Sequence, residues 1–164
     1  MRIIAGEWRR RQLKAPPGEA TRPTADRTRE TLFNMLASRL GSFENLRVAD
    51  LFAGSGALGL EALSRGAGHC LFVEQDAAAI RALRTNIAAL RAQPRCAVQA
   101  GSVLSLGPAT QPYDLVLLDP PYRSGAGAVA LETAGDEPPK VKALEIESER
   151  IVGAARLTLM RLGR

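Results

Sequence analysis

The sequence predicts an α/β protein built on a doubly wound, mostly parallel sheet. Four short apolar segments, at residues 47–52, 70–73, 96–100 and 113–118, are separated by helix-forming segments such as 58–64 and 77–90. This alternation is typical of parallel strands joined by crossover helices. A glycine-rich turn directly follows the first strand. In such sheets the ligand site lies at the carboxyl ends of the strands, so we expect the functional residues there.

Smaller elements are predicted at both ends of the chain. Residues 2–14 alternate loosely between apolar and basic residues around Gly6, which indicates a small N-terminal β-hairpin with one basic face. Residues 15–23 are rich in proline and form a linker, and residues 24–40 have helical spacing of apolar side chains. Residues 143–151 and 155–162 predict an antiparallel C-terminal hairpin that turns at Gly153. We therefore expect an appendage in residues 1–23 and the main domain in residues 24–164.

The charge distribution favours a nucleic-acid partner. Of the net charge of +5, residues 1–30 contribute +4, from eight basic and four acidic residues. Only three of the 22 basic residues are lysine, and arginine binds phosphate in a bidentate manner and stacks on bases. The alternative is an ordinary solvated surface encoded by a GC-rich genome. No apolar run is long enough to cross a bilayer and no signal peptide is evident, so we expect no membrane contact and a cytoplasmic location.

The cysteines indicate neither a disulfide scaffold nor a metal site. Cys70 and Cys96 are too few for the first and lack ligand spacing for the second, so we expect reduced, buried thiols.

The glycine turn has the pattern G-x-G-x-x-G, formed by Gly54, Gly56 and Gly59. Glu74 follows 20 residues after Gly54, at the end of the second strand, where an acid can accept both hydroxyls of an adenosine ribose. Nicotinamide dinucleotides and S-adenosylmethionine both use this pattern. Asp50 favours the second, because a carboxylate would repel a pyrophosphate but suits a ligand that carries an ammonium and a sulfonium; its other possible role is to cap a helix or loop. The residues expected to hold the cofactor are Asp50, Phe52, Ala53, Gly54, Ser55, Gly56, Glu74, Gln75, Ser102 (a candidate acceptor for the adenine amine) and Val103.

The fourth strand ends in Asp119, Pro120, Pro121 and Tyr122, the candidate catalytic residues. Proline fixes φ, so this segment presents one carboxylate, one rigid carbonyl and one aromatic ring. Two acceptors can hold an exocyclic amine and stabilise the positive charge that develops as its nitrogen attacks a methyl group, while the ring stacks on the base. The reaction needs only in-line alignment of the reacting atoms and no metal. Without the glycine turn, the same four residues would read as an ordinary rigid turn.

These motifs resemble the class I S-adenosylmethionine-dependent methyltransferases, and more narrowly the bacterial 16S ribosomal RNA (guanine-N2)-methyltransferase family of the RsmD type. The resemblance is carried by residues 1–8, 22–34, 50–66, 72–76 and 119–122. Residues 22–34 are the most specific of these, because generic methyltransferases lack them.

The resemblance implies a Rossmann-like methyltransferase that transfers a methyl group from S-adenosylmethionine to N2 of a guanine in 16S rRNA and releases S-adenosylhomocysteine. It implies that Asp50, Gly54, Gly56 and Glu74 hold the cofactor, and that Asp119, Pro120 and Tyr122 position the amine. It also implies that the basic hairpin binds rRNA within a partly assembled small ribosomal subunit, and we expect a monomer. The residues expected to contact RNA are Arg9, Arg10, Arg11, Arg22, Arg27 and Arg29.

The chain departs from the family pattern after Tyr122. Members of the family have a further helix and an apolar strand before an acidic segment like residues 132–134, whereas only residues 123–131 intervene here. A crossover helix and strand need a dozen or more residues. Either a central strand is absent or an internal stretch is missing from this sequence, and the second is favoured because loss of a strand would open the core.

Three other functions remain open at this stage. A DNA or RNA amino-methyltransferase acting on adenine or cytosine could use the same four residues, although the chain has no separate target-recognition segment. A nicotinamide-dependent oxidoreductase would need a substrate domain and a catalytic acid; His69, the single histidine, precedes the second strand and reads as a surface residue. A non-catalytic RNA-binding module would have no need for both Glu74 and Asp119.

Overall fold

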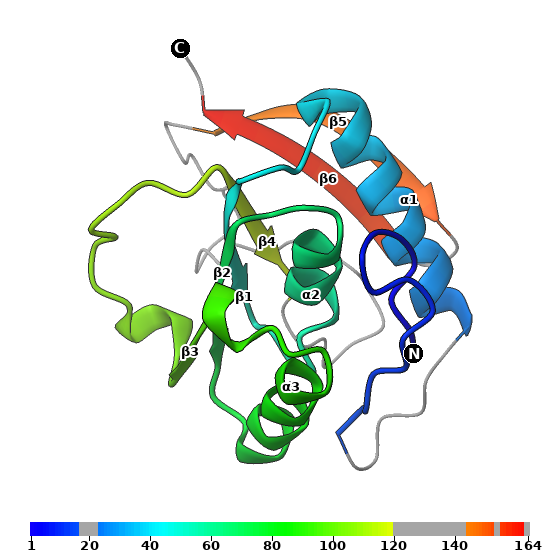
Figure 1. Cartoon of the computed structure of the whole chain (residues 1–164). Coiled ribbons are helices and arrows are strands. Elements are labelled where there is room, and N and C mark those ends of the chain that lie inside the picture. The colour runs from blue at the N-terminus through cyan, green and yellow to red at the C-terminus, as the bar shows by residue number, and fades with distance from the viewer. Residues whose placement is uncertain (17–22, 120–143, 153–154, 163–164) are drawn as a thin grey trace. The chain divides into compact units, whose positions relative to one another are not determined.

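The computed structural model describes residues 1–16, 23–119, 144–152 and 155–162. It forms two compact units, Met1–Asp119 and Pro120–Arg164. The first unit contains the sheet and its helices (Figure 1). Its elements are α1 (Pro23–Leu40), β1 (Arg47–Leu51), α2 (Ala57–Ser64), β2 (His69–Glu74), α3 (Ala77–Ala89), β3 (Cys96–Ala100), β4 (Leu115–Leu118) and the short 3-10 turns Gln93–Arg95 and Val103–Ser105.

The described sheet of the first unit has four parallel strands in the order β3-β2-β1-β4. The chain therefore winds from β1 through β2 to β3 and then returns to the other side of β1. Leu51, the last residue of β1, pairs with Val73 on one side and with Leu118 on the other. The carboxyl ends of β1, β2 and β4 thus lie at one edge, and the predicted fold class is confirmed.

The core lies between the sheet and helices α2 and α3. Leu60 and Leu63 of α2 and Leu83 of α3 are fully buried, as is Phe72 of β2. A Cβ atom added to Gly59 would lie 2.3 Å from the Phe72 ring. Because real Cβ atoms do not approach so closely, the third glycine of the motif is what allows α2 to pack against the sheet.

The basic segment at the start of the chain folds back on itself as predicted, and residues 1–14 are called the N-terminal hairpin below. Arg2 and Gln12 form an antiparallel bridge. The side chains of Ile3, Trp8 and Leu13 are buried. Figure 1 shows this hairpin in dark blue beside α1 and α2. The predicted division after residue 23 into an appendage and a main domain stays a prediction.

The fourth strand differs from its prediction. It begins at Leu115 instead of residue 113, and Val116 and Leu118 expose 47% and 38% of their surface. Leu117 is buried, so one face of β4 is covered, whereas the face that carries Val116 and Leu118 is exposed. Within the described residues β4 pairs only with β1, so it lies at an edge of the described sheet. The segment 123–131, whose shortness the sequence analysis noted, lies outside the described residues.

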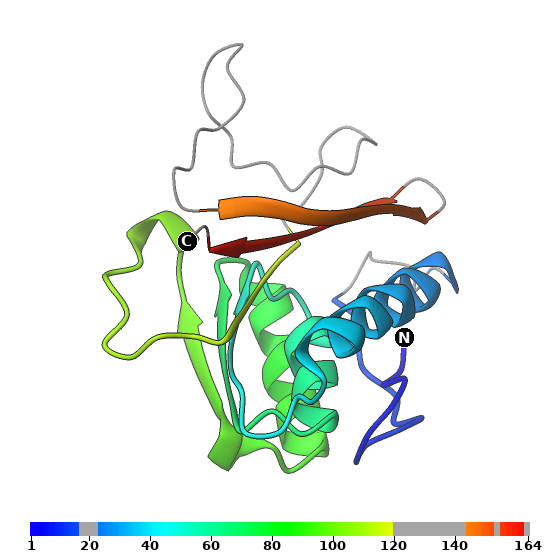
Figure 2. The same cartoon turned by 90° about the horizontal axis from the view of Figure 1, so that it is seen from above.

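The second unit contains β5 (Leu144–Val152) and β6 (Ala155–Leu162), which pair antiparallel with a register shift between Ile146 and Ser148 (Figure 2). This confirms the predicted C-terminal hairpin, although its turn at Gly153 lies outside the described residues. None of the helices in the described ranges has the length and apolar character that a transmembrane span requires.

The cysteines and the histidine also have defined places. Cys70 and Cys96 are free thiols on adjacent strands; Cys70 is buried, and partial burial raises the pKa of Cys96 to about 11. His69 is half-buried as the first residue of β2, where burial and the nearby charge of Arg47 lower its pKa. The expectation that His69 lies on the surface is thus only partly met.

Candidate active site and nucleic-acid interface

Three carboxylates gather at the carboxyl edge of the parallel sheet. Asp50 lies near the end of β1, Glu74 ends β2, and Asp119 directly follows β4. The strand register places these three ends next to one another. Asp119 and Glu74 each raise the pKa of Asp50 through their charge, which shows that the three groups act on one another. This edge is therefore strongly attractive to a cation.

Asp50 is the most constrained of the three. Its side chain is only 1% exposed, and Oδ2 accepts a hydrogen bond from the Gly59 N–H at 2.9 Å. This bond caps the first turn of α2, so the capping role considered from the sequence is real. The other oxygen, Oδ1, is buried and has no partner among the described residues. The pKa of Asp50 is raised to about 7, mainly by burial; the Gly59 hydrogen bond opposes this rise, and the charges of Asp119 and Glu74 add to it.

The glycine turn adopts a sharply folded backbone. Phe52, Gly54 and Gly56 all have positive φ, at 73°, 55° and 84°. Phe52 is held in this unfavourable region because its N–H and that of Ala53 both donate to the Val73 carbonyl, at 3.1 and 2.9 Å. A Cβ atom added at Gly54 would meet no described atom within 4 Å. The turn therefore leaves open space next to Gly54, where a ligand can approach the backbone.

Glu74 joins the glycine turn to the end of β2. Its Oε2 accepts from the Gly54 N–H at 2.8 Å, and its Oε1 accepts from the N–H groups of Gln75 and Asp76 at 2.8 Å. The predicted ribose-binding acid thus lies within hydrogen-bond distance of the predicted loop. Gln75 itself is exposed next to it.

The end of β3 lies beside the same acid. The Gly101 N–H donates to the Glu74 carbonyl at 2.8 Å, and Ser102 follows. The Ser102 hydroxyl accepts from the Leu104 N–H at 3.2 Å and caps the turn that begins at Val103. Its predicted contact with adenine stays a prediction. Of the four candidate catalytic residues, Asp119 is exposed, and Pro120, Pro121 and Tyr122 lie outside the described residues.

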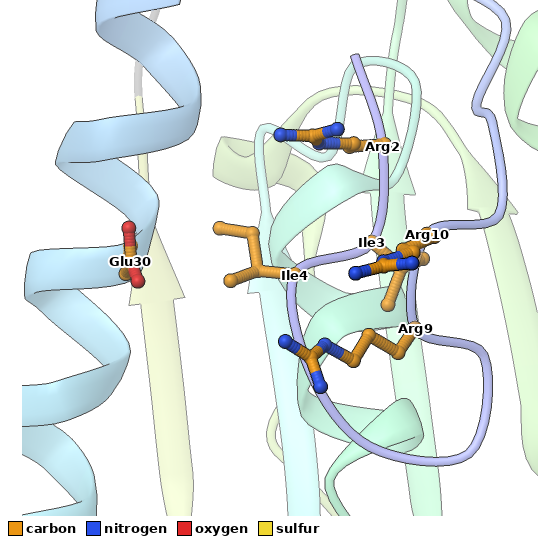
Figure 3. Close-up of a pocket in the computed structure, with 6 residues that line it drawn as sticks. All are labelled: Arg2, Ile3, Ile4, Arg9, Arg10 and Glu30. Atoms are coloured by element: carbon orange, nitrogen blue, oxygen red, sulfur yellow. The ribbon is translucent and has the colours of Figure 1, made fainter.

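A basic cleft separates the N-terminal hairpin from α1. Its volume is about 420 Å3, and Figure 3 shows the Ile4 side chain pointing across it toward Glu30 of α1. The guanidinium groups of Arg2, Arg9 and Arg10 line the hairpin side. None of these three forms an ion pair within the part of the chain that the structure describes. The cleft therefore presents cations that are available to an external anion.

The remaining arginines assigned to RNA differ in their surroundings. Arg11 is exposed while its Nη2 donates to the Ala89 carbonyl at the end of α3 at 2.8 Å, and Arg27 is exposed on α1. Arg29 is only 4% exposed; it donates to the Arg2 carbonyl and binds Asp26 at 3.0 Å. Because it is buried and engaged, we exclude Arg29 from the interface as a correction to the sequence analysis. Arg22 lies outside the described residues.

Two polar residues of α2 that the sequence analysis missed fasten the hairpin. Glu61 is fully buried, and its carboxylate accepts from the N–H groups of Ile4 and Ala5 at 2.8 and 3.1 Å. Ser64 Oγ accepts from the Trp8 N–H at 3.0 Å and donates to the Ala5 carbonyl at 2.6 Å. The available signal was the occurrence of polar residues within the apolar run of α2. These contacts make the hairpin an integral part of the first unit.

The sequence prediction also missed a third residue, Asn86, which is a polar residue on the buried side of α3. It is 1% exposed, and its amide bonds to the backbone of Lys14 and to the Ser55 carbonyl. It therefore touches both the hairpin and the glycine turn.

The strand order, the glycine turn after β1 and the acid at the end of β2 define the Rossmann-like fold of class I methyltransferases. Residues 1–135 match the model of the family described as Conserved hypothetical protein 95, and the chain belongs to this family, the RsmD family.

Known relatives agree with this assignment. The chain is 45% identical to Ribosomal RNA small subunit methyltransferase D of Escherichia coli K12 over 125 residues, which are 76% of this chain and 62% of the relative. It is 42% identical to the protein of the same name from Haemophilus influenzae over 130 residues, 74% of this chain and 64% of the relative. The chain thus spans less than two thirds of the length of these relatives.

A solved structure is similar over almost the whole chain. The protein named "Putative methyltransferase yhhF from Escherichia coli" superposes with a TM-score of 0.78 at 35% identity, covering 99% of this chain and 97% of that chain.

Proposed function

We propose that this chain transfers a methyl group from S-adenosylmethionine to the exocyclic N2 amine of a guanine in 16S rRNA. The observation that carries the proposal is the grouping of Asp50, Glu74 and the glycine turn at one edge of the sheet, next to Asp119. The relatives named Ribosomal RNA small subunit methyltransferase D support the substrate class.

The residues at this edge fit the cofactor. The buried Oδ1 of Asp50, which has no partner among the described residues, suits a ligand with cationic groups, and the space next to Gly54 admits a ligand close to the backbone. Glu74 would accept hydrogen bonds from the ribose, and Ser102 would accept one from the adenine. When bound, this cofactor supplies an electrophilic methyl group on a sulfonium.

The chain's own residues then orient the amine. Asp119 would accept one N–H of the guanine amine, and the Pro120 carbonyl would accept the other. These two acceptors would stabilise the positive charge that develops on the amine nitrogen as it gains the methyl group, until the nitrogen loses one of its protons. Tyr122 would stack on the base and align it for in-line attack.

The hairpin would bind the RNA. Arg2, Arg9 and Arg10 line the cleft, Arg11 and Arg27 are exposed elsewhere in the first unit, and all can contact phosphates. Binding as a monomer to a partly assembled small ribosomal subunit belongs to the same proposal.

Two variants test the division of roles. Asp119→Ala should abolish methyl transfer to 16S rRNA and leave the dissociation constant for S-adenosylhomocysteine nearly unchanged, because Asp119 acts on the amine. Glu74→Ala should weaken S-adenosylhomocysteine binding by about 1–3 kcal/mol, the cost of losing a charged acceptor. Calorimetric titration and transfer of a labelled methyl group measure the two effects.

The same assays decide between the alternatives. Tight binding of a nicotinamide dinucleotide without binding of S-adenosylhomocysteine would make the chain an oxidoreductase. Methyl transfer to DNA but not to 16S rRNA would make it a DNA amino-methyltransferase. Cofactor binding that Asp119→Ala abolishes would contradict the role given to this residue.

A further inference from the structure

Asn86 forms a buried link between the N-terminal hairpin and the glycine turn. Its Oδ1 accepts from the Lys14 N–H at 2.8 Å, and its Nδ2 donates to the Lys14 carbonyl at 3.0 Å and to the Ser55 carbonyl at 2.9 Å. One amide group therefore fixes the end of the hairpin and the middle of the turn at the same time.

The link is specific to the amide. Both protons of Nδ2 are used, each on a backbone carbonyl, and Oδ1 is used on a backbone N–H, so the group has little freedom to rotate. Ser55 is 7% exposed and Asn86 1% exposed, so water cannot easily replace the hydrogen bond between them. A shift of Lys14 thus changes the support of the Ser55 carbonyl, and a shift of the turn changes the support of Lys14.

The two linked segments end in the two proposed binding surfaces. Ser55 lies between Gly54 and Gly56, the glycines beside the proposed cofactor site. Lys14 closes the segment that carries Arg9, Arg10 and Arg11. The hydrogen bonds of Glu61 and Ser64 attach Ile4, Ala5 and Trp8 of the hairpin to α2 and not to the turn.

We propose that Asn86 is a positioning residue that couples RNA binding at the N-terminal hairpin to cofactor binding at the glycine turn. This inference rests on the proposed function. Each ligand orders its own segment, and the amide transmits this order to the other segment, so each ligand tightens the binding of the other. By thermodynamic linkage the two enhancements are equal.

The test measures the ratio of S-adenosylhomocysteine dissociation constants without and with unmodified small ribosomal subunits. In the unaltered protein we expect this ratio to be at least about 5, the lower range of such couplings. In Asn86→Ala and in the isosteric Asn86→Asp it should fall to about 1. If Asn86 only supports the fold, its replacement would raise both dissociation constants and leave their ratio unchanged.

Two control variants isolate the amide. Lys14→Ala removes a charge but keeps the backbone groups that Asn86 contacts, so it should keep the ratio even if the subunits bind less tightly. Thr85→Ala changes the neighbouring exposed position on α3, where the hydroxyl donates to the Arg81 carbonyl, and this variant should also keep the ratio. A ratio that Lys14→Ala lowers as much as Asn86→Ala would overturn the proposal.

A measurement on the unaltered protein keeps the inference testable if both Asn86 variants unfold. Added S-adenosylhomocysteine should slow hydrogen exchange at the Lys14 amide as well as in residues 53–57. Protection of the turn without protection of Lys14 would overturn the coupling and leave the proposed function intact. Absence of protection at the turn would overturn the proposed function, and this inference with it.

Discussion

At the scale of single residues, the two carboxylate oxygens of Asp50 have different surroundings. One oxygen caps α2 through the Gly59 N–H, and the other is buried without a partner among the described residues. A buried carboxylate near two other acids resists ionisation, which is why its pKa rises to about 7. Arg29 is also buried, but its guanidinium group has partners: it forms an ion pair with Asp26 and donates a hydrogen bond to the Arg2 carbonyl.

The ionisation of Asp50 should make cofactor binding depend on pH. Above pH 7 the carboxylate is charged and favours a cationic ligand, and below it the neutral acid does not. We expect the affinity for S-adenosylmethionine to rise between pH 6 and pH 8, by up to about tenfold per pH unit below the pKa. Calorimetric titration across this range measures it. In Asp50→Asn the affinity should be lower and nearly independent of pH, and an unchanged pH profile in this variant would contradict the role of Asp50.

The raised pKa of Asp50 has the opposite effect on the stability of the unliganded protein, which we expect to fall as the pH rises. The value in the folded state is raised from 3.8 to about 7, so the folded protein binds the proton more tightly than the unfolded chain does. The contribution of Asp50 to stability is therefore present below pH 4 and lost as the pH rises through 7. Thermal unfolding of Asp50→Asn alongside the unaltered protein should show this difference growing between pH 4 and pH 8.

At the scale of elements, the contact of the N-terminal hairpin with α2 depends on one glycine. Gly6 has a φ of 84°, and a Cβ atom added there would lie 1.8 Å from the Ser64 carbonyl oxygen. The chain passes so close to the end of α2 that the Glu7 N–H donates to this oxygen at 2.7 Å. Any side chain at position 6 would therefore push the hairpin away from Glu61 and Ser64.

Gly6→Ala should destabilise the protein by about 1–3 kcal/mol, because the new methyl group meets rigid backbone. Urea unfolding gives the free energy of unfolding for this comparison. Gly107→Ala is the matched control, since a Cβ atom there meets no described atom within 4 Å. Equal unfolding free energies for the two variants would show that the hairpin can move away from α2 at no cost.

At the scale of the whole molecule, the N-terminal hairpin carries a run of three exposed arginines, Arg9, Arg10 and Arg11. The guanidinium groups of Arg9 and Arg10 face the cleft opposite α1, and Arg11 lies exposed at the end of α3. Exposed cations that contact phosphates release counterions on binding, so their contribution depends on salt.

The triple replacement of Arg9, Arg10 and Arg11 by alanine should weaken RNA binding and flatten its salt dependence. The slope of log K against log salt should fall by about 2 units if all three contact phosphates of single-stranded RNA. Filter binding between 50 and 200 mM salt, roughly the range over which such slopes are measured, gives this slope. The control replaces Arg81, Arg84 and Arg91, three exposed arginines on and after α3. Equal losses in both triple variants would place the RNA contact elsewhere.

The sequence by itself determined the parallel sheet, the turn at Gly54 and Gly56 and the acid at the end of β2, because these follow from apolar spacing and glycine along a short stretch of chain. Only the tertiary structure decided which polar groups are exposed. Arg29, Glu61 and Asn86 look like surface residues in the sequence, but each is buried by segments distant along the chain. Val116 and Leu118 of β4 show the reverse, because they are apolar and yet exposed. Burial depends on contacts between distant segments, and a local pattern does not contain them.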